Sequence, residues 1–503
     1  MEKTVQELME AVSPEDWAQV PESVLNLIKE LVRRVELLEQ ETKALRADNE
    51  LLKEQVARTS ANSSQPPSKN PQGFKPNRKE ATGQKRGGQV GHQGHSQKLY
   101  PIEMCQDVID YYPQQCSECG AEVFDSTVSE VYRHQVVEIP PIEPIIIEHR
   151  FHPMTCACCG KKNQAPEMAE VIGNGGYGPR VTAYISLLSS QYRQSYRQIQ
   201  RAMHDVFGLE ISLGTIKKLR TEVSEAVSGA VTDAINYMQQ QPIVGVDETG
   251  FKQRNGDGQN EAKTSGWLWV AVTPLIVCFQ MILGRGREAA QAFLGENFSG
   301  FIISDRCPAY NWVNVERRQL CWAHLKRDFI QIAERTGVSA EIGKALLEQE
   351  KKLFDLWYEF KNNQLTREEL VKMIEPIKAE VSSILKQAGE IQVGKEEKTP
   401  LAKTVRTCRK LSKVEVALWS FVHEEGIEPT NNESERAIRP AVIWRSTSFG
   451  SDSEAGSLFV SRLLTVVSSL NRQGRNVLEF LCESVAAARN GSTPPSLLTR
   501  PTP

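Results

Sequence analysis

The sequence predicts a multidomain α/β protein with a strand-rich core in the second half of the chain, and three observations support this fold class. A chain of 503 residues is too long for a single hydrophobic core. Residues 241–305 hold apolar runs of strand length, whereas the stretches before and after them have helical periodicity. Five of the 11 cysteines fall in two tight clusters, which indicates a separate metal-binding module upstream of the core.

Charge and composition narrow the possible partners. The 60 basic residues are balanced by 63 acidic ones, so the net charge of -3 gives no sign of a nucleic-acid partner and any basic surface must be local. No apolar stretch approaches the about 20 residues that cross a bilayer, and the acidic N-terminus lacks the apolar segment of an export signal. We therefore expect a soluble cytoplasmic protein without a membrane partner, whose clustered cysteines bind metal rather than form disulfides.

Residues 1–56 are expected to form an N-terminal helix and a coiled coil. The two core positions of a seven-residue repeat are occupied by Leu31, Leu38, Leu45 and Leu52, and by Ile28, Val35, Thr42 and Asn49. Leucines at one position, with β-branched residues and one asparagine at the other, favour a parallel two-stranded coiled coil. We interpret this arm as a leucine zipper that forms a homodimer or a higher oligomer. The alternative is a single amphipathic helix packed on its own chain.

Residues 57–100 are predicted to be a basic disordered linker. Ser, Asn, Gln, Pro and Gly dominate, and too few large apolar residues are present to offset the entropy of ordering the segment. Glu80 is its single acidic residue. The basic residues that we expect to contact DNA phosphates are Lys75, Arg78, Lys79, Lys85 and Arg86. A solubilising tether would explain the composition equally well.

Two CxxC-G turns in residues 101–172 predict a structural zinc site. Four thiolates would surround the ion tetrahedrally, and the glycine after each turn lets the backbone curl beneath the metal. The expected ligands are Cys116, Cys119, Cys156 and Cys159. The residues between the turns are β-prone, which suits a zinc-ribbon-like domain whose turns are joined by strands. Free buried cysteines are the alternative; Cys158 can replace a neighbouring ligand, and Cys105 lies outside the pattern.

Residues 173–235 are predicted to be helical and to contain a helix-turn-helix. Ile199, Met203 and Val206 fit one face of its first helix, Gly208 suits the turn, and Ser212 can cap the second helix. The second helix would carry three basic residues toward a DNA groove, Lys217, Lys218 and Arg220. Two helices around a glycine turn also occur in bundles that bind no DNA.

Residues 241–320 are expected to form the first part of a catalytic core, with three successive strands, a helix and a fourth strand. Asp247 and Glu248 would close the first strand and Asp305 the fourth, so the two aspartates converge if these strands are neighbours. That is the layout of a ribonuclease H-like fold. Carboxylates at this position are the oxygen ligands that Mg²⁺ accepts in two-metal phosphodiester chemistry. The alternative is a solvated turn after a strand.

A third carboxylate is predicted further along the chain. Thr430 can cap a helix with Glu433 at its third position, which places Glu435 in the first turns. Glu435 would face the sheet while Arg436 and Arg439 meet phosphates; the alternative is a capped, exposed helix start. The remaining segments are a helical insertion, the second part of the core and a C-terminal tail, at residues 321–425, 426–490 and 491–503.

The insertion opens with a C-x-x-H pattern. Cys321 and His324 can be half of a zinc site, but no other half is evident in the sequence. We favour a packing or DNA-strand role near the active site for Cys321, His324 and Arg327.

These motifs together resemble the DDE transposases of the insertion sequence 66 family. The resemblance is carried by VDETG, SDRCPAY, CWAHLKRDF and TNNESERAIRP, and upstream by the zipper, the GGQVGHQGH linker and the paired CxxC turns. The resemblance covers nearly the whole chain, and the motifs occur in the same order as in the family. It implies a ribonuclease H-like core in which Asp247, Asp305 and Glu435 are the metal ligands. The supporting residues that it implies are Glu248, Cys321, His324, Arg327, Asn431, Asn432, Arg436 and Arg439.

The resemblance implies a Mg²⁺-dependent or Mn²⁺-dependent transposase that cleaves at the ends of an insertion sequence and transfers 3′-hydroxyl ends into target DNA. Its implied partners are double-stranded DNA, further copies of the chain and accessory proteins encoded by the same element, in the bacterial nucleoid. One alternative is a catalytically inactive DNA-binding protein derived from a transposase. Another is a ribonuclease H-like nuclease acting on RNA or Holliday junctions, which leaves the zipper and the DNA-binding modules unexplained.

Overall fold

A computed structural model describes residues 13–63, 70–71, 74, 98–123, 131–165 and 176–498. The chain forms two compact units, one made of residues 75–147 and 202–210 and the other of the remaining residues. The linker residues predicted to contact DNA, Lys75, Arg78, Lys79, Lys85 and Arg86, lie outside the described residues. None of the described helices combines the length and the apolar composition that crossing a bilayer requires.

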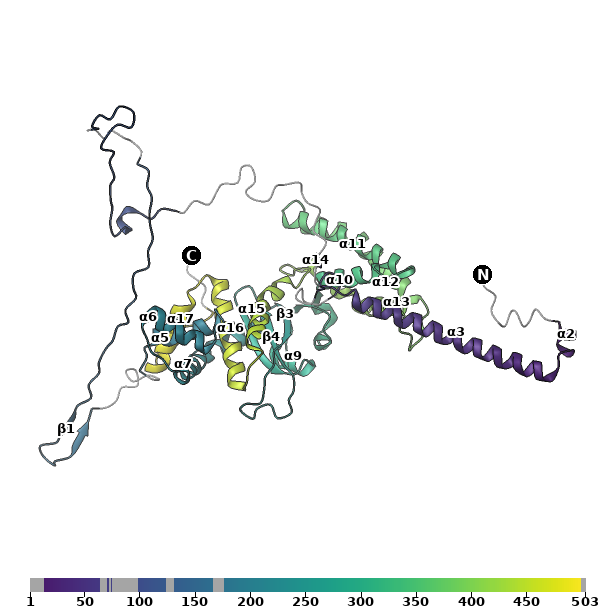
Figure 1. The fold of residues 1–503 in the computed structure, drawn as a ribbon, viewed down its shortest axis with the longest axis horizontal. Coiled ribbons are helices and arrows are strands. Elements are labelled where there is room, and N and C mark those ends of the chain that lie inside the picture. The colour runs from purple at the N-terminus through teal and green to yellow at the C-terminus, as the bar shows by residue number, and fades with distance from the viewer. Residues whose placement is uncertain are drawn as a thin grey trace. The chain divides into compact units, whose positions relative to one another are not determined.

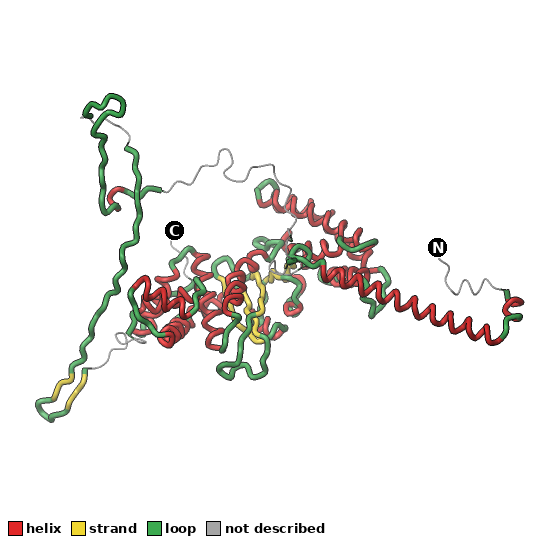
Figure 2. The backbone as a smooth tube through the Cα atoms, in the orientation of Figure 1, coloured by secondary structure: helices red, strands yellow, loops and turns green. Residues whose placement is uncertain are grey.

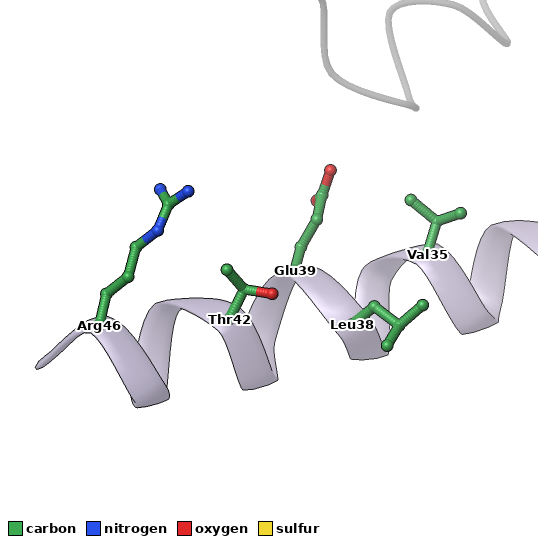
Figure 3. A pocket seen from close by; sticks show the side chains of 5 residues that line it. All are labelled: Val35, Leu38, Glu39, Thr42 and Arg46. Carbon is green, nitrogen blue, oxygen red and sulfur yellow. The ribbon is translucent and has the colours of Figure 1, made fainter. Parts of the chain in front are cut away.

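The N-terminal arm is a short helix, α2 (Pro14–Ala18), followed by the long helix α3 (Glu22–Val56) (Figure 1). The leucines of the predicted zipper are 52–68% exposed. A hollow of about 470 Å³ lies on this face of α3, lined by Val35, Leu38, Glu39, Thr42 and Arg46 (Figure 3).

The C-terminal end of α3 packs on the rest of its own chain. The Glu54 carboxylate accepts hydrogen bonds from Arg335 at 2.7 Å and from Lys403 at 3.0 Å. The four leucines of the zipper face remain more than half exposed in this chain.

The cysteine-rich region has little regular structure. It contains a 3₁₀ turn at Ile102–Met104 and a two-stranded antiparallel sheet of β1 (Pro153–Thr155) and β2 (Lys162–Gln164). The prediction that strands join the two CxxC turns is wrong for residues 131–150, which form no strand. Tyr132 and Ile145 are 89% and 91% exposed. A β-prone segment becomes a strand only when a neighbouring strand takes its backbone hydrogen bonds, and no such partner pairs with this one.

The helices immediately before the main sheet are α5 (Pro179–Ser190), α6 (Tyr196–Phe207), α7 (Leu213–Ala226) and α8 (Ser228–Gln239). The predicted turn and cap between α6 and α7 are confirmed. Gly208 has φ +62°, and the Ser212 hydroxyl accepts a hydrogen bond from the backbone N–H of Thr215 at 3.1 Å. Ile199 and Met203 are buried as expected, whereas Val206 is 50% exposed.

A five-stranded mixed sheet forms the centre of the larger unit (Figure 2). Its elements in chain order are β3 (Ile243–Gly250), β4 (Gly266–Val272), β5 (Val277–Leu283), α9 (Arg287–Leu294), β6 (Phe301–Ser304) and β7 (Arg318–Leu320). The strand order is β5-β4-β3-β6-β7, with β3–β4 and β4–β5 antiparallel and β3–β6 and β6–β7 parallel. The four predicted strands are present, and β7 is an additional one.

Helices after β7 build a second hydrophobic cluster and then return to the sheet. The cluster is formed by α10 (Trp322–Ala333), α11 (Val338–Lys361), α12 (Arg367–Glu390), α13 (Pro400–Ser412) and α14 (Ser420–His423). The returning helices are α15 (Asn432–Ser448), α16 (Glu454–Gln473) and α17 (Val477–Asn490).

Helix α16 protects the edge of the sheet. The Thr465 hydroxyl accepts a hydrogen bond from the Phe279 N–H at 2.8 Å, and the Ser469 hydroxyl accepts one from the Val277 N–H at 3.1 Å. At Val277 and Phe279, outward backbone groups of the edge strand β5 are therefore bonded to helix side chains rather than left open to another chain.

Candidate active site

The parallel pairing of β3 with β6 places two aspartates side by side. Ile243 pairs with Phe301 and Gly245 with Ile303, which is an offset of 58 residues along the chain. Asp247 and Asp305 have the same separation, and β6 ends one residue before Asp305. The register therefore brings Asp305 next to Asp247 at the end of β6, as predicted for neighbouring strands. Asp247 lies within β3 rather than at its end, because β3 continues to Gly250 along β4.

One face of β3 is covered by α15. A Cβ atom on Gly245 would lie 2.6 Å from the Ser434 hydroxyl, and Arg445 donates a hydrogen bond to the Thr249 hydroxyl at 2.7 Å. Successive side chains of a strand alternate between its faces, so Asp247 shares this face with Gly245 and Thr249. The Asp247 side chain is therefore on the side of the sheet against which α15 packs.

The start of α15 is fixed by Asn431. The Asn431 side-chain amide donates to the Val246 carbonyl at 2.7 Å, and its backbone N–H donates to the Cys321 sulfur at 3.1 Å. The predicted cap by Thr430 is wrong: the residue at the cap position is Asn431, and its side chain bonds the strand instead of the helix. The Glu435 N–H donates to the Asn431 carbonyl at 3.1 Å, so Glu435 lies in the first turn of α15, close to β3.

The C-x-x-H segment meets Glu435. His324 Nδ1 and an Arg327 guanidinium nitrogen both lie 3.5 Å from Glu435 Oε1. This oxygen and His324 Nδ1 are buried, yet neither makes a hydrogen bond. Burial, followed by the positive charge of Arg327, lowers the pKa of His324, so the imidazole is held in its neutral form. The sequence placed these residues near the active site but gave no sign that they contact Glu435.

Glu248 lies on the opposite face of β3, as its alternation with Asp247 requires. Its side chain is 1% exposed. Arg285 donates to one carboxylate oxygen at 2.7 and 2.9 Å, and the Tyr310 hydroxyl donates to the other at 2.6 Å. Burial and the charge of Glu248 raise the pKa of Tyr310 well above its ordinary value. Glu248 is thus a paired buried carboxylate, and no pattern in the sequence pointed to Arg285 and Tyr310 as its partners.

The negatively charged form of Asp247 is disfavoured in the folded protein. Burial raises its pKa to about 8, and the charges of Glu248, Asp305 and Glu435 act in the same direction, against a hydrogen bond from the Glu248 N–H at 2.9 Å. When like charges are held close together in a buried place, the binding of a proton or of a cation becomes favourable. A divalent ion beside Asp247 would offset this repulsion.

The raised pKa of Asp247 predicts that the stability of the folded protein depends on pH. The folded-state pKa of Asp247 lies above the unfolded value of 3.8, so stability should fall as the pH rises between about 4 and about 8 in buffer free of divalent metal. Asp247→Asn should weaken this fall, and Mg²⁺ should stabilise the wild type at pH 8 more than the variant. Scanning calorimetry of both proteins at pH 5 and pH 8 checks this. Identical pH profiles would contradict the placement of Asp247.

The donor atoms near β3 distinguish between possible metal sites. Two groups have ligand atoms within 4.8 Å of one another: Cys321 with His324 and Glu435, and Glu248 with Asp305 and Cys307. Burial raises the pKa of the Cys321 thiol, and it raises that of the Cys307 thiol to about 12. Burial therefore disfavours the thiolate form of both cysteines, so metal binding at either group would have to displace a thiol proton. Among the described residues, Asp247, Asp305 and Glu435 do not form such a group, although carboxylate oxygens are the donors that suit Mg²⁺ or Mn²⁺.

Arginines on the exposed side of α15 complete this region. Arg436 and Arg439 are exposed, and neither has an ion-pair partner among the described residues. Asn432 is exposed at the helix start, and Glu433 pairs with Arg472 at 2.5 Å.

The predicted DNA-reading helix, α7, has its basic residues in two different environments. Lys217 and Lys218 are exposed. The Arg220 guanidinium lies 3.9 Å from the Phe459 ring centre and 4.6 Å from that of Tyr196, and it donates a hydrogen bond to the Tyr196 hydroxyl. Its burial lowers the pKa of Arg220. Arg220 was expected to face a groove, but stacking on these two rings holds it inside the protein.

The two CxxC-G turns have the same local structure. Gly120 and Gly160 adopt φ +73° and +68°, conformations that favour glycine. In each turn the glycine N–H donates to the carbonyl of the first cysteine, at 3.0 Å to Cys116 and 2.9 Å to Cys156. Backbone N–H groups of the turn lower the pKa of the Cys116 and Cys156 thiols. Each turn is therefore shaped to present thiolates to a metal.

Comparisons with known proteins show the family of this chain. Residues 174–458, more than half of the chain, match the model of a family described as "Transposase IS66 family". Residues 113–160 match the "zinc-finger binding domain of transposase IS66". The chain is also 25% identical over 416 residues to the uncharacterized protein y4qI of Sinorhizobium fredii (strain NBRC 101917 / NGR234), which covers 78% of this chain and 73% of the relative. The chain therefore belongs to the IS66 family of transposases, proteins of mobile elements, and carries the zinc-finger domain of that family.

Proposed function

We propose that this transposase cleaves DNA at the ends of an insertion sequence and joins the freed 3′-hydroxyl ends to target DNA. Asp247, Asp305 and Glu435 would hold two Mg²⁺ or Mn²⁺ ions. The observation that supports the proposal most is the β3–β6 register, in which Asp247 and Asp305 have the offset of the paired residues. Helix α15 covers the same face of β3 and carries Glu435 in its first turn. Bound metal would supply activation of the attacking oxygen and stabilisation of the leaving one.

The core of the proposal is a ribonuclease H-like domain made of residues 241–320 and 426–490. Its support is the central position of β3, with β4 antiparallel on one side and β6 parallel on the other. Residues 321–425 would be the helical insertion, with a hydrophobic cluster of their own.

The chain's own groups would position the reacting DNA. Asn431 ties the start of α15 to Val246, so Glu435 keeps a fixed place relative to Asp247. Arg327 would hold the Glu435 carboxylate from the other side, where His324 lies at the same distance of 3.5 Å without a hydrogen bond. Arg436 and Arg439 would meet phosphates, because each is an unpaired cation one to four residues from Glu435.

DNA recognition is assigned to the upstream modules. We propose that Cys116, Cys119, Cys156 and Cys159 bind one structural Zn²⁺, since the two turns have equal geometry and fall within the matched zinc-finger domain. On α7, the second helix of the predicted helix-turn-helix, the exposed cations Lys217 and Lys218 would contact DNA.

The test is a cleavage and joining assay with purified protein, Mg²⁺ and a plasmid that carries the ends of the element. We expect nicked or linear products and covalent joining of the ends to a second DNA. An inactive DNA-binding descendant would bind the ends without cutting them. A ribonuclease H-like nuclease would cut RNA or a Holliday junction without joining ends.

We also propose that α3 forms a coiled coil with a second copy of the chain. The double variant Leu38→Glu and Leu45→Glu places charges at two core positions of the repeat, so dimer affinity should fall at least about a hundred-fold. Leu37→Glu is the matched control, because Leu37 is 48% exposed on the same helix but outside the core positions. Light scattering over a range of concentrations checks this; a double variant that remains dimeric would rule out the zipper.

A further inference from the structure

Two buried polar atoms without a hydrogen bond face each other where the start of α10 meets the start of α15. They are Nδ1 of His324 and Oε1 of Glu435. Arg327 also approaches this oxygen, at 3.5 Å, but makes no hydrogen bond to it. Buried polar atoms in folded proteins nearly always have a partner, so a facing pair without one is typical of a place where an ion or a water molecule binds.

The separation of the two atoms fits two ligands of one ion. They lie 3.5 Å apart, whereas hydrogen bonds between nitrogen and oxygen are about 2.7 to 3.2 Å long. An ion with metal–ligand distances of about 2.1 Å holds two of its ligands about 3.0 Å apart at a right angle and about 3.4 Å apart at a tetrahedral angle. The imidazole nitrogen and the carboxylate oxygen are therefore spaced as a metal would hold them.

The same pair lies close to the aspartates of the proposed metal site. The negative charges of Glu435 and Asp305 both act on the His324 imidazole. Both charges also act on the Asp247 carboxylate. One electrostatic neighbourhood therefore contains the three carboxylates and the imidazole, so an ion bound by Glu435 can lie within reach of His324.

Cys321 has a different part in this arrangement. Its sulfur accepts a hydrogen bond from the Asn431 N–H at 3.1 Å, and its carbonyl accepts one from the His324 N–H at 3.1 Å. The first bond joins α10 to the start of α15, and the second lies in the first turn of α10. The C-x-x-H pattern thus places His324 opposite Glu435, with Cys321 as the positioning residue and His324 as the donor.

We propose that His324 is a nitrogen ligand of the divalent ion held by Glu435, beside the carboxylates of the proposed site. This inference rests on the proposed function, because it requires the ion that Glu435 would hold. It adds that the two ions of the site differ: one has oxygen ligands from the protein alone, and the other also has an imidazole. Imidazole nitrogen favours later transition metals such as Co²⁺, whereas carboxylate oxygen suits Mg²⁺.

The experiment measures metal binding by the full-length protein without DNA, so that catalysis plays no part. Protein loaded with one Zn²⁺ per chain is titrated with Co²⁺, whose visible absorption changes with its ligands, and Mg²⁺ is measured by competition against bound Co²⁺. The variants are His324→Ala, which removes the donor, and His324→Asn, which places an amide oxygen near the position of Nδ1. His423→Asn is the matched control, because His423 is exposed on α14.

His324→Ala should bind Co²⁺ about ten-fold to a hundred-fold more weakly than the wild type, with an altered absorption spectrum. His324→Asn should recover Mg²⁺ binding but not Co²⁺ binding, because it replaces a nitrogen ligand by an oxygen ligand. His423→Asn should bind both ions as the wild type does. A change in the preference between the two ions is a result that a purely structural role of His324 would not produce.

Wild-type Co²⁺ affinity and spectrum in His324→Ala would overturn the inference. An equal loss of Co²⁺ and Mg²⁺ binding in both His324 variants, with a lowered Tm, would overturn it as well. In both cases the carboxylate site would stand if Asp247→Asn still weakens metal binding. A wild type that binds neither ion beyond its zinc would instead contradict the proposed function.

Discussion

Asp247→Asn should abolish both cleavage at the element ends and strand transfer, with a loss of at least about a thousand-fold in rate. The loss of one metal-binding oxygen removes several kcal/mol of transition-state stabilisation, and each 1.36 kcal/mol corresponds to a factor of ten. Asp305→Asn and Glu435→Gln should have the same effect, because in the proposed site the three carboxylates would hold the same ions. Single-turnover assays with end-containing DNA in Mg²⁺ and in Mn²⁺ measure these rates.

Glu433→Gln is the matched control for this series. Glu433 lies two residues before Glu435 on α15, but it is exposed and pairs with Arg472. It should keep near wild-type activity. The account is wrong about the ligands if any of the three carboxylate variants retains strand transfer while it still binds DNA.

Removal of zinc should unfold the zinc-finger domain and eliminate specific binding to the element ends. Structural zinc contributes about 10 to 16 kcal/mol in small zinc domains, and the described residues 131–150 form no strand and expose their apolar side chains. The metal is therefore expected to be the main source of order in this domain. Cys116→Ser or Cys156→Ser should reduce the zinc content from one ion per chain to none and make the domain sensitive to protease.

Cys158 supplies the control for the zinc prediction. It is exposed and lies between the two cysteines of the second turn. Cys158→Ser should retain the zinc. Loss of zinc in Cys158→Ser, with retention in Cys159→Ser, would reassign the fourth ligand.

The sequence predicted best those features of the site that depend on residues close together in the chain. Apolar runs with β-branched residues predicted the strands around Asp247 and Asp305. Residues paired between β3 and β6 are 58 positions apart in the chain, which is also the separation of these two aspartates. The turn at Gly208 and the cap at Ser212 were also predictable, because each depends on residues only a few positions apart.

Contacts between distant segments could not be predicted in the same way. The pairing of Glu248 with Arg285 and Tyr310, and the approach of His324 to Glu435, depend on how separate elements pack. Arg220 has the sequence context of a DNA-reading residue, yet Phe459 lies more than 200 residues away and covers it. Asn431 replaced Thr430 as the residue at the helix start because its amide bonds the Val246 carbonyl, a partner on another element.

The position of bound Mn²⁺ in a crystal of the full-length protein tests the central claim most directly. Anomalous scattering locates Mn²⁺ independently of activity. We predict density between the carboxylates of Asp247 and Asp305, with Glu435 as a further ligand. Density instead at Glu248 with Asp305 and Cys307, or at Cys321 with His324 and without Asp247, would contradict the proposed metal site.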